Sequence, residues 1–171
     1  NDIAMALRTP TKDAEEIKVL SGCAKQLLAD PDAQVEVPGL GDRAPRMLSR
    51  QALAGVIEPR VEEIFSLVQQ VIRDSGFEEV LSSGIVLAGG SAVMPGLIEL
   101  GEDIFLKPVR RGIPTHASAL SDIVAHPRAA TVMGLLEEAR LARLRGHTVA
   151  QKASSMQSVF SRLKDWFTGV F

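Results

Sequence analysis

Two adjacent glycines, Gly89 and Gly90, follow a short apolar run and precede a predicted helix start. Glycine has no Cβ, so the backbone at such a pair can turn sharply and approach a flat ligand closely. The helix start that follows offers free backbone N–H groups as hydrogen-bond donors. The pattern fits a plain strand-to-helix turn, which is the commoner case, or a nucleotide site. Its glycine spacing matches neither the P-loop nor the dinucleotide fingerprint.

Charged side chains form two further patterns of interest. Glu15 and Lys18 lie three residues apart on a predicted helix, where spacing alone indicates an exposed ion pair of small energy. Four arginines gather in an otherwise acidic region: Arg43, Arg46, Arg50 and Arg60. Their spacing fits an ordinary solvated face, although guanidinium groups also suit the recognition of carboxylates.

The last residues of the chain combine aromatic and basic side chains. The sequence has six Phe and one Trp, and four of these seven lie in residues 160–171. If 157–171 is helical, Phe160, Leu163, Phe167 and Val170 form an apolar stripe opposite polar side chains. Such a helix is too short to span a bilayer, and it fits equally a membrane surface or a protein surface.

The composition excludes several classes of protein. The 171 residues are 46% hydrophobic and 23% charged, which suits a folded core rather than disorder. A net charge of -2 argues against a nucleic-acid partner. Cys23 is the single cysteine, and the three histidines have no zinc spacing, so we expect a reducing environment and no metal site. The sequence has no signal-peptide pattern or apolar run long enough for a spanning helix.

The first half of the chain is predicted to be mainly helical. A short helix over 2–8 is followed by a second helix from Thr11 to about Ala29. Short strands and turns are expected between 30 and 45. Ser49 then caps a long helix that ends at Gly76, and Pro59 should kink or break it.

The second half alternates strands and helices. We predict a buried strand over 84–88, a helix through about Phe105, a short strand over 108–111 and a loop over 112–127. Pro127 opens a further helix, and 146–156 has the composition of a flexible linker. The mixed order predicts an α/β domain with a β-rich insertion.

The stretch 85–96, Ile-Val-Leu-Ala-Gly-Gly-Ser-Ala-Val-Met-Pro-Gly, resembles the adenosine motif of the actin/Hsp70 ATPase superfamily. Within that superfamily the chain resembles the FtsA family of bacterial cell division proteins. Four further stretches carry the resemblance: 1–9, 14–18, 43–60 and the aromatic tail. One departure is that the family often has Thr and Ala where this chain has Ala88 and Ser91.

The resemblance implies half of an actin-like (ribonuclease H-like) ATPase fold with a small β-rich lobe and a C-terminal amphipathic helix. The chain would be the C-terminal portion of such a protein. Residues 1–8 and 76–145 would form the larger subdomain, and 9–75 the smaller lobe, which closes over adenosine and docks FtsZ. Residues 146–156 would be the linker and 157–171 the membrane-targeting helix.

The resemblance also implies an ATP site, with magnesium held mainly by the missing N-terminal half. Its nucleotide-binding residues would be Gly89, Gly90, Ser91, Met94, Glu15 and Lys18. The phosphate-binding hairpins and the residues that position the attacking water would lie outside the chain. We therefore expect no catalytic residues here, no hydrolysis by this portion alone and weak ATPase activity at most in the complete protein.

Two surfaces for partners follow from the same resemblance. Arg46, Arg50 and Arg60 would bind the acidic C-terminal peptide of FtsZ. The anionic lipid surface would be contacted by Phe160, Arg162, Leu163, Lys164, Trp166, Phe167, Val170 and Phe171.

The implied function is that of a cell division adaptor. It would bind ATP, polymerise in an actin-like way and tether FtsZ filaments to the cytoplasmic face of the cell membrane at the division site. Other divisome proteins would be further partners, and nucleic acid would not. The alternatives are an Hsp70-like or sugar-kinase-like ATPase and an FtsA-like pilus-assembly protein of the same fold.

Overall fold

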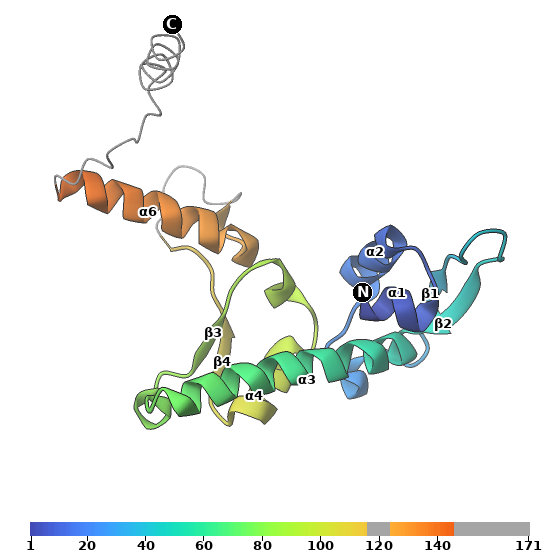
Figure 1. Ribbon diagram of the computed structural model, residues 1–171, viewed down its shortest axis with the longest axis horizontal. Helices are drawn as coiled ribbons and strands as arrows, with labels where there is room; N and C mark the ends of the chain where they lie inside the picture. Colours follow the sequence, from blue (N-terminus) through green and yellow to red (C-terminus); the bar gives the residue numbers. More distant parts are fainter. Residues whose placement is uncertain (116–123, 146–171) are drawn as a thin grey trace, which may run out of the picture. The chain divides into compact units, whose positions relative to one another are not determined.

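The computed structural model describes residues 1–115 and 124–145, which divide into two units, one up to Met133 and one from Gly134 onward. The first unit contains most of the helices and both strand pairs (Figure 1). Its helices are α1 (Asp2–Leu7), α2 (Thr11–Ser21), α3 (Arg50–Asp74) and α4 (Leu97–Phe105), with the 3-10 turns η1 (Gln26–Leu28), η2 (Glu78–Val80), η3 (Gly90–Val93) and η4 (Pro127–Ala129). Its strands are β1 (Gln34–Val37), β2 (Arg46–Ser49), β3 (Ile85–Leu87) and β4 (Val109–Arg111).

The first hydrophobic cluster joins α1, α2, β1 and the N-terminal part of α3. Leu53 has no exposed surface and lies at its centre, where Leu7, Ile17 and Val37 pack around it. Strands β1 and β2 pair antiparallel, from Gln34 opposite Ser49 to Val37 opposite Arg46. The alternation along β1 buries Val35 and Val37 and exposes the residues between them.

The second cluster lies along the C-terminal part of α3, which packs against α4 and the β3–β4 pair. The rings of Phe65 and Phe105 are 5.2 Å apart and tilted by 44°, a favourable arrangement for two aromatics. Val109 begins β4, which pairs in parallel with β3. Val61 of α3 and Met94 contact both clusters. Figure 1 shows α3 running past the elements of each.

The long helix confirms the predicted cap but not the predicted break. The Ser49 side chain accepts a hydrogen bond of 3.2 Å from the Ala52 backbone N–H, which is the N-cap interaction. The helix then continues through Pro59 to Asp74. Apolar side chains pack on both sides of the proline, with Ile57 in the first cluster and Phe65 in the second. This packing keeps the helix continuous although proline removes one backbone donor.

The second helix ends earlier than its sequence predicts. The prediction extended it to about Ala29, whereas α2 stops at Ser21 and Gly22 turns into an extended conformation. A Cβ on Gly22 would lie 2.4 Å from the Lys18 carbonyl oxygen, so the close turn requires glycine. The Ala24 backbone N–H then donates to the Pro95 carbonyl oxygen at 2.8 Å, and Ala24 is completely buried. A long-range contact therefore replaces helical hydrogen bonds.

The predicted subdomain boundaries stay a prediction. Residues of α1, which we assigned with 76–145, pack in the first cluster beside α2 and α3. The second unit begins inside α6 (Ala130–Leu144), which starts three residues after Pro127 and is preceded by η4. Within that unit the Arg140 guanidinium binds the Glu137 carboxylate at 2.6 Å. None of the described helices is long and apolar enough to cross a bilayer.

Candidate nucleotide cleft

A cleft of about 510 Å³ lies between α2, the glycine turn and η4. Five of the six side chains or backbone positions expected at a nucleotide site line it together: Glu15, Lys18, Gly90, Ser91 and Met94. The sixth, Gly89, directly precedes Gly90 and opens the turn. The cleft also has lining residues that the sequence did not single out, namely Val19, Gly22, Val93, Pro95, His126 and Arg128.

The glycine turn has a backbone that only glycine adopts readily. Gly89 has φ +98° and ψ 175°, which is disfavoured for any residue with a Cβ. Its N–H donates to the Pro127 carbonyl oxygen at 3.0 Å, and its carbonyl accepts from the Ala92 N–H at 3.3 Å. A Cβ at Gly89 or Gly90 would meet no atom within 4 Å. The backbone at the turn therefore borders open space that a ligand could fill.

The opposite wall is the flank of α2. Ala14 and Ile17 are buried on the inner face of this helix, which leaves Glu15 and Lys18 on its cleft side. The Lys18 ammonium donates to the Glu15 carboxylate at 2.6 Å, and the side chains are 32% and 62% exposed. Both groups can therefore exchange this weak pairing for contacts to a polar ligand.

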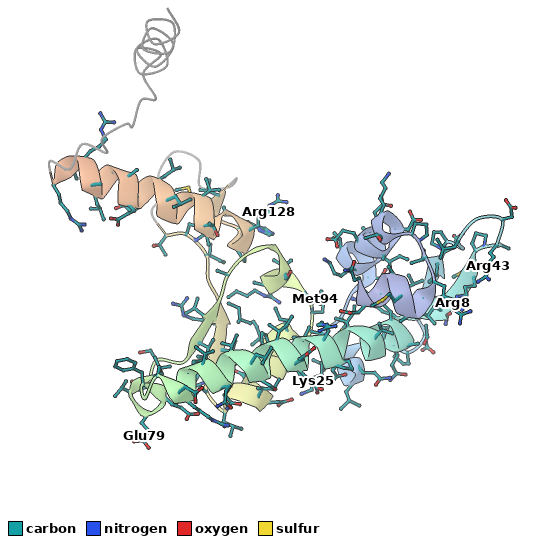
Figure 2. The ribbon with its side chains drawn as sticks, viewed as in Figure 1. Arg8, Lys25, Arg43, Glu79, Met94 and Arg128 are labelled. Atoms are coloured by element: carbon teal, nitrogen blue, oxygen red, sulfur yellow. The ribbon has the colours of Figure 1, made fainter. Side chains whose placement is uncertain are left out.

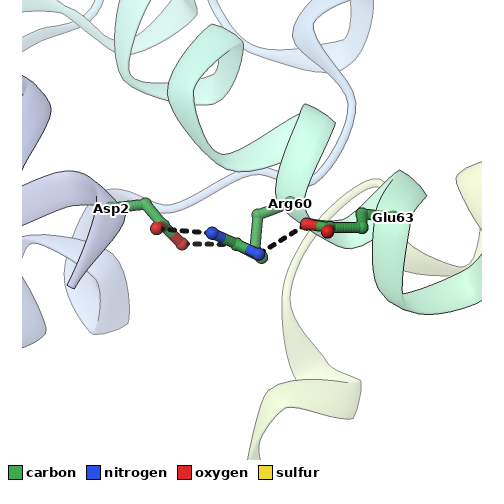
Figure 3. A network of polar contacts seen from close by, with 3 residues as sticks. All are labelled: Asp2, Arg60 and Glu63. Carbon is green, nitrogen blue, oxygen red and sulfur yellow. Dashed lines mark hydrogen bonds and ion pairs between the residues drawn. The ribbon is translucent and has the colours of Figure 1, made fainter.

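An adjoining apolar cavity of about 440 Å³ shares Glu15, Lys18, Ser91 and Met94 with the cleft. Its remaining lining comes mainly from α3, with contributions from α2 and the start of α1. Arg60 lines it and holds both carboxylate oxygens of Asp2, at 2.7 and 2.8 Å (Figure 3). Arg60 also donates to Glu63 at 2.5 Å. The hydrogen bond from Arg60 lowers the pKa of Asp2, because it stabilises the ionised carboxylate.

One protein-family model matches most of the chain. The model described as "Cell division protein FtsA" matches residues 1–134, which is most of the sequence. The chain belongs to the FtsA family. It is a portion of an FtsA protein, because it spans about 42% of the length of the relatives it matches.

Curated FtsA proteins match most or all of the chain. The cell division protein FtsA of Pseudomonas aeruginosa is 48% identical over 177 residues, covering 100% of this chain and 42% of the relative. FtsA of Escherichia coli K12 is 39% identical over 180 residues, covering 100% and 43%. FtsA of Bacillus subtilis is 36% identical over 152 residues, covering 88% and 33%. The chain is therefore part of a cell division protein, as the resemblance implied.

The fold agrees with this relationship. A solved structure, MreB5 of Spiroplasma citri bound to ADP, superposes with a TM-score of 0.56 at 16% identity. The match covers 84% of this chain and 44% of that one. The predicted half of an actin-like fold is therefore confirmed.

Each of the three arginines expected to contact FtsZ forms a hydrogen bond to another segment of this chain. Arg46 on β2 donates to the Leu7 carbonyl oxygen at 3.0 Å, at the end of α1. Arg50, the first residue of α3, donates to the Ser21 carbonyl oxygen at 2.9 Å, at the end of α2. Arg60 binds Asp2 as described above. Arg46 and Arg60 thus bind the two ends of α1, and Arg50 binds the end of α2. Their roles in peptide binding stay a prediction.

The residues expected to contact lipid lie outside the described part of the chain. This holds for the whole set: Phe160, Arg162, Leu163, Lys164, Trp166, Phe167, Val170 and Phe171. The expected linker over 146–156 lies there too.

His126 and Arg128 were missed because their place in the cleft depends on a long-range contact. The sequence predicted a loop up to Pro127, and nothing in its pattern relates this segment to the glycine turn. The bond from Gly89 to Pro127 makes the connection. A basic residue next to a helix-opening proline was the one available signal, and it is too common to indicate a site.

Proposed function

We propose that the complete protein is an ATP-binding, actin-like adaptor of cell division that holds FtsZ filaments at the cytoplasmic face of the membrane. Membership of the FtsA family over residues 1–134 carries this proposal. It is supported by the cleft, in which five residues expected to bind nucleotide lie together although they come from separate segments. The division site is the location that this family implies.

The chemistry of the cleft fits adenosine. The open space beside Gly89 and Gly90 lets a planar base approach the backbone. Glu15 can accept hydrogen bonds from ribose hydroxyls, and Lys18 can donate to them. When bound, ATP supplies a phosphoryl group whose magnesium and phosphate contacts come from the part of the protein outside this chain. The residues described here then bind and orient the nucleoside and do not hydrolyse it.

Replacing Lys18 tests the nucleotide site. Lys18→Ala in the complete protein should weaken ATP binding about 10- to 150-fold, because a hydrogen bond to a charged group contributes about 1.5–3 kcal/mol. Lys12→Ala is the matched control, since Lys12 is an exposed lysine of the same helix and is absent from the cleft lining. Isothermal titration calorimetry gives both dissociation constants. Equal affinities for the two variants would exclude Lys18 as a ligand contact.

The docking of FtsZ is proposed for the lobe that carries Arg46, Arg50 and Arg60. A guanidinium has five N–H donors, and Arg46 and Arg50 each use one in the bonds described above. Their remaining donors can pair with carboxylates of an acidic peptide. Arg60 already holds Asp2 with two nitrogens and Glu63 with a third, so it has the least remaining capacity.

Charge reversal at Arg46 is the sharpest test of this surface. Arg46→Glu should weaken binding of the FtsZ C-terminal peptide, measured by fluorescence anisotropy, more strongly at low salt than at high salt. Arg73→Glu is the control. Arg73 lies near the C-terminal end of α3, and it is also an exposed arginine that pairs with a neighbour, Glu78. Arg60→Glu is less informative, since it breaks ion pairs with both Asp2 and Glu63, whereas Arg46→Glu breaks one hydrogen bond to Leu7. Unchanged peptide affinity in Arg46→Glu would remove this residue from the docking surface.

The membrane contact is proposed for residues 157–171. Trp166 is the only tryptophan of the 171 residues, so in this portion of the protein tryptophan fluorescence reports on this segment alone. Anionic vesicles should shift its emission to the blue, and Phe167→Glu should abolish the shift. One short helix with Arg162 and Lys164 gives weak, reversible binding, so actin-like polymerisation would supply avidity by holding many tails at one surface. An unchanged spectrum for a polymerised sample would contradict the tether.

A further inference from the structure

The cleft has a third wall whose residues have no role in the nucleotide contacts proposed so far. His126, the N-cap of η4, and Arg128 on η4 line it together with Glu15 and Lys18 of α2. The Gly89 N–H bond to the Pro127 carbonyl oxygen anchors this wall directly to the glycine turn. Arg128 follows Pro127 by one residue, and Figure 2 shows it on the segment that ends in α6, with Met94 on the turn below. The position of Arg128 is therefore coupled to the backbone that would face a base.

Arg128 differs from the other cation of the cleft in its bonding. The Lys18 ammonium is paired with Glu15. The Arg128 side chain is exposed and has neither an ion pair nor a hydrogen bond within residues 1–115 and 124–145. Its backbone N–H donates to Nδ1 of His126 at 3.2 Å, which fixes the imidazole and leaves the guanidinium unused. Because the guanidinium has no partner among the described residues, it is available to a ligand.

The chemistry of this group favours a flat ring over a phosphate. A guanidinium is planar and weakly hydrated, and it stacks on aromatic faces. The partner that the cleft supplies on the other side is the glycine turn, whose missing Cβ atoms leave space for a ring. The anchoring bond places Arg128 near this turn, where the proposed function puts the base. The phosphate contacts, by the same proposal, lie outside the chain.

We propose that Arg128 is a base-binding residue of the nucleotide site, with its guanidinium stacked on the ring of the bound nucleoside. This inference rests on the proposed nucleotide function and adds a residue to it. It makes η4 a functional wall of the cleft and gives the anchoring bond from Gly89 to Pro127 a role in setting nucleoside affinity.

The experiment compares ATP with adenosine, which lacks phosphates. In the complete protein, Arg128→Ala should raise the dissociation constants for both ligands by the same factor, about two- to fivefold, as expected for an exposed cation–π contact. Arg128→Lys should behave like the alanine variant, because lysine keeps the charge and loses the plane. Arg110→Ala is the control, since Arg110 on β4 is exposed and absent from the cleft lining. The thermal unfolding midpoint without ligand should not change in any variant.

The outcomes distinguish a failure of the Arg128 proposal from a failure of the proposed nucleotide binding. If ATP binds and Lys18→Ala weakens it, while Arg128→Ala leaves both affinities unchanged, the inference is overturned and the nucleotide site stands. A loss for ATP without a loss for adenosine would assign Arg128 to the phosphates and overturn the stacking role. Full rescue by Arg128→Lys would overturn it too. If the wild-type protein binds neither ligand, both proposals fail.

Discussion

Adding one methyl group at Gly89 isolates the backbone strain of the glycine turn. With φ +98° and ψ 175°, Gly89 lies in a region that is costly for alanine, by about 1–3 kcal/mol. The added Cβ would meet no atom within 4 Å, so no steric clash adds to this cost. Gly90→Ala is the matched control, because Gly90 also has open space around its Cβ position and has no positive φ.

The comparison of the two variants removes the unfolded-state contribution. Replacing glycine by alanine reduces the entropy of the unfolded chain by about 0.4–1 kcal/mol in both variants, so this term cancels in their difference. Gly89→Ala should therefore have a free energy of unfolding about 1–3 kcal/mol lower than that of Gly90→Ala. Urea denaturation followed by circular dichroism measures this difference. Equal unfolding free energies would refute the assignment of strain to Gly89.

Gly89→Ala has a second expected effect on the cleft. The strained residue donates the bond of 3.0 Å to the Pro127 carbonyl oxygen, which holds the wall that carries Arg128. If alanine relaxes by rotating the backbone, this N–H turns away and the wall loses its anchor. Nucleotide affinity should then fall more in Gly89→Ala than in Gly90→Ala. The same calorimetric titration used for Lys18→Ala gives the answer.

Two further predictions concern the core and the ion cluster. Leu53→Ala should lower the free energy of unfolding by about 2–5 kcal/mol, because Leu53 is completely buried. Leu27→Ala is the control: this side chain is 84% exposed, so the same urea denaturation assay should show little change. Asp2→Asn should lower the free energy of unfolding near neutral pH and leave it unchanged in strong acid. Arg60 lowers the folded-state pKa of Asp2 below 3.8, so the stabilisation from this ion pair is complete above pH 3.8 and is lost as the pH falls through the lowered pKa. Urea midpoints of wild type and variant should therefore converge in acid, and a constant difference would contradict the assigned pair.

The sequence predicted the elements whose signals are local. Ser49 as the cap of α3 could be read from residue type and the apolar repeat that follows, because a cap bond joins residues three positions apart. The short strand β3 was predicted from its apolar run, although Val86 is exposed and the strand is not buried as expected. The short strand β4 lies within the predicted 108–111. The glycine turn at Gly89 was predicted because its conformation depends on the absence of one Cβ. The family resemblance rested on the same local stretches.

Other features required contacts between distant residues. The end of α2 at Gly22 depends on the bond from Ala24 to Pro95, and the local pattern up to Ala29 still favoured a helix. The continuity of α3 through Pro59 depends on packing that offsets a local helix-breaking tendency. The carbonyl partners of Arg46 and Arg50 lie on other helices, so their spacing in the sequence could not indicate these bonds.

The sequence by itself therefore predicted the family, the actin-like fold and five of the residues that line the candidate cleft. The tertiary structure decided that these residues meet in one cleft, and that Arg128 joins them through the bond between Gly89 and Pro127. The physical reason is the range of the interactions. Propensity, capping and glycine conformation act within a few residues, whereas a cleft exists only where segments far apart in the chain are packed together.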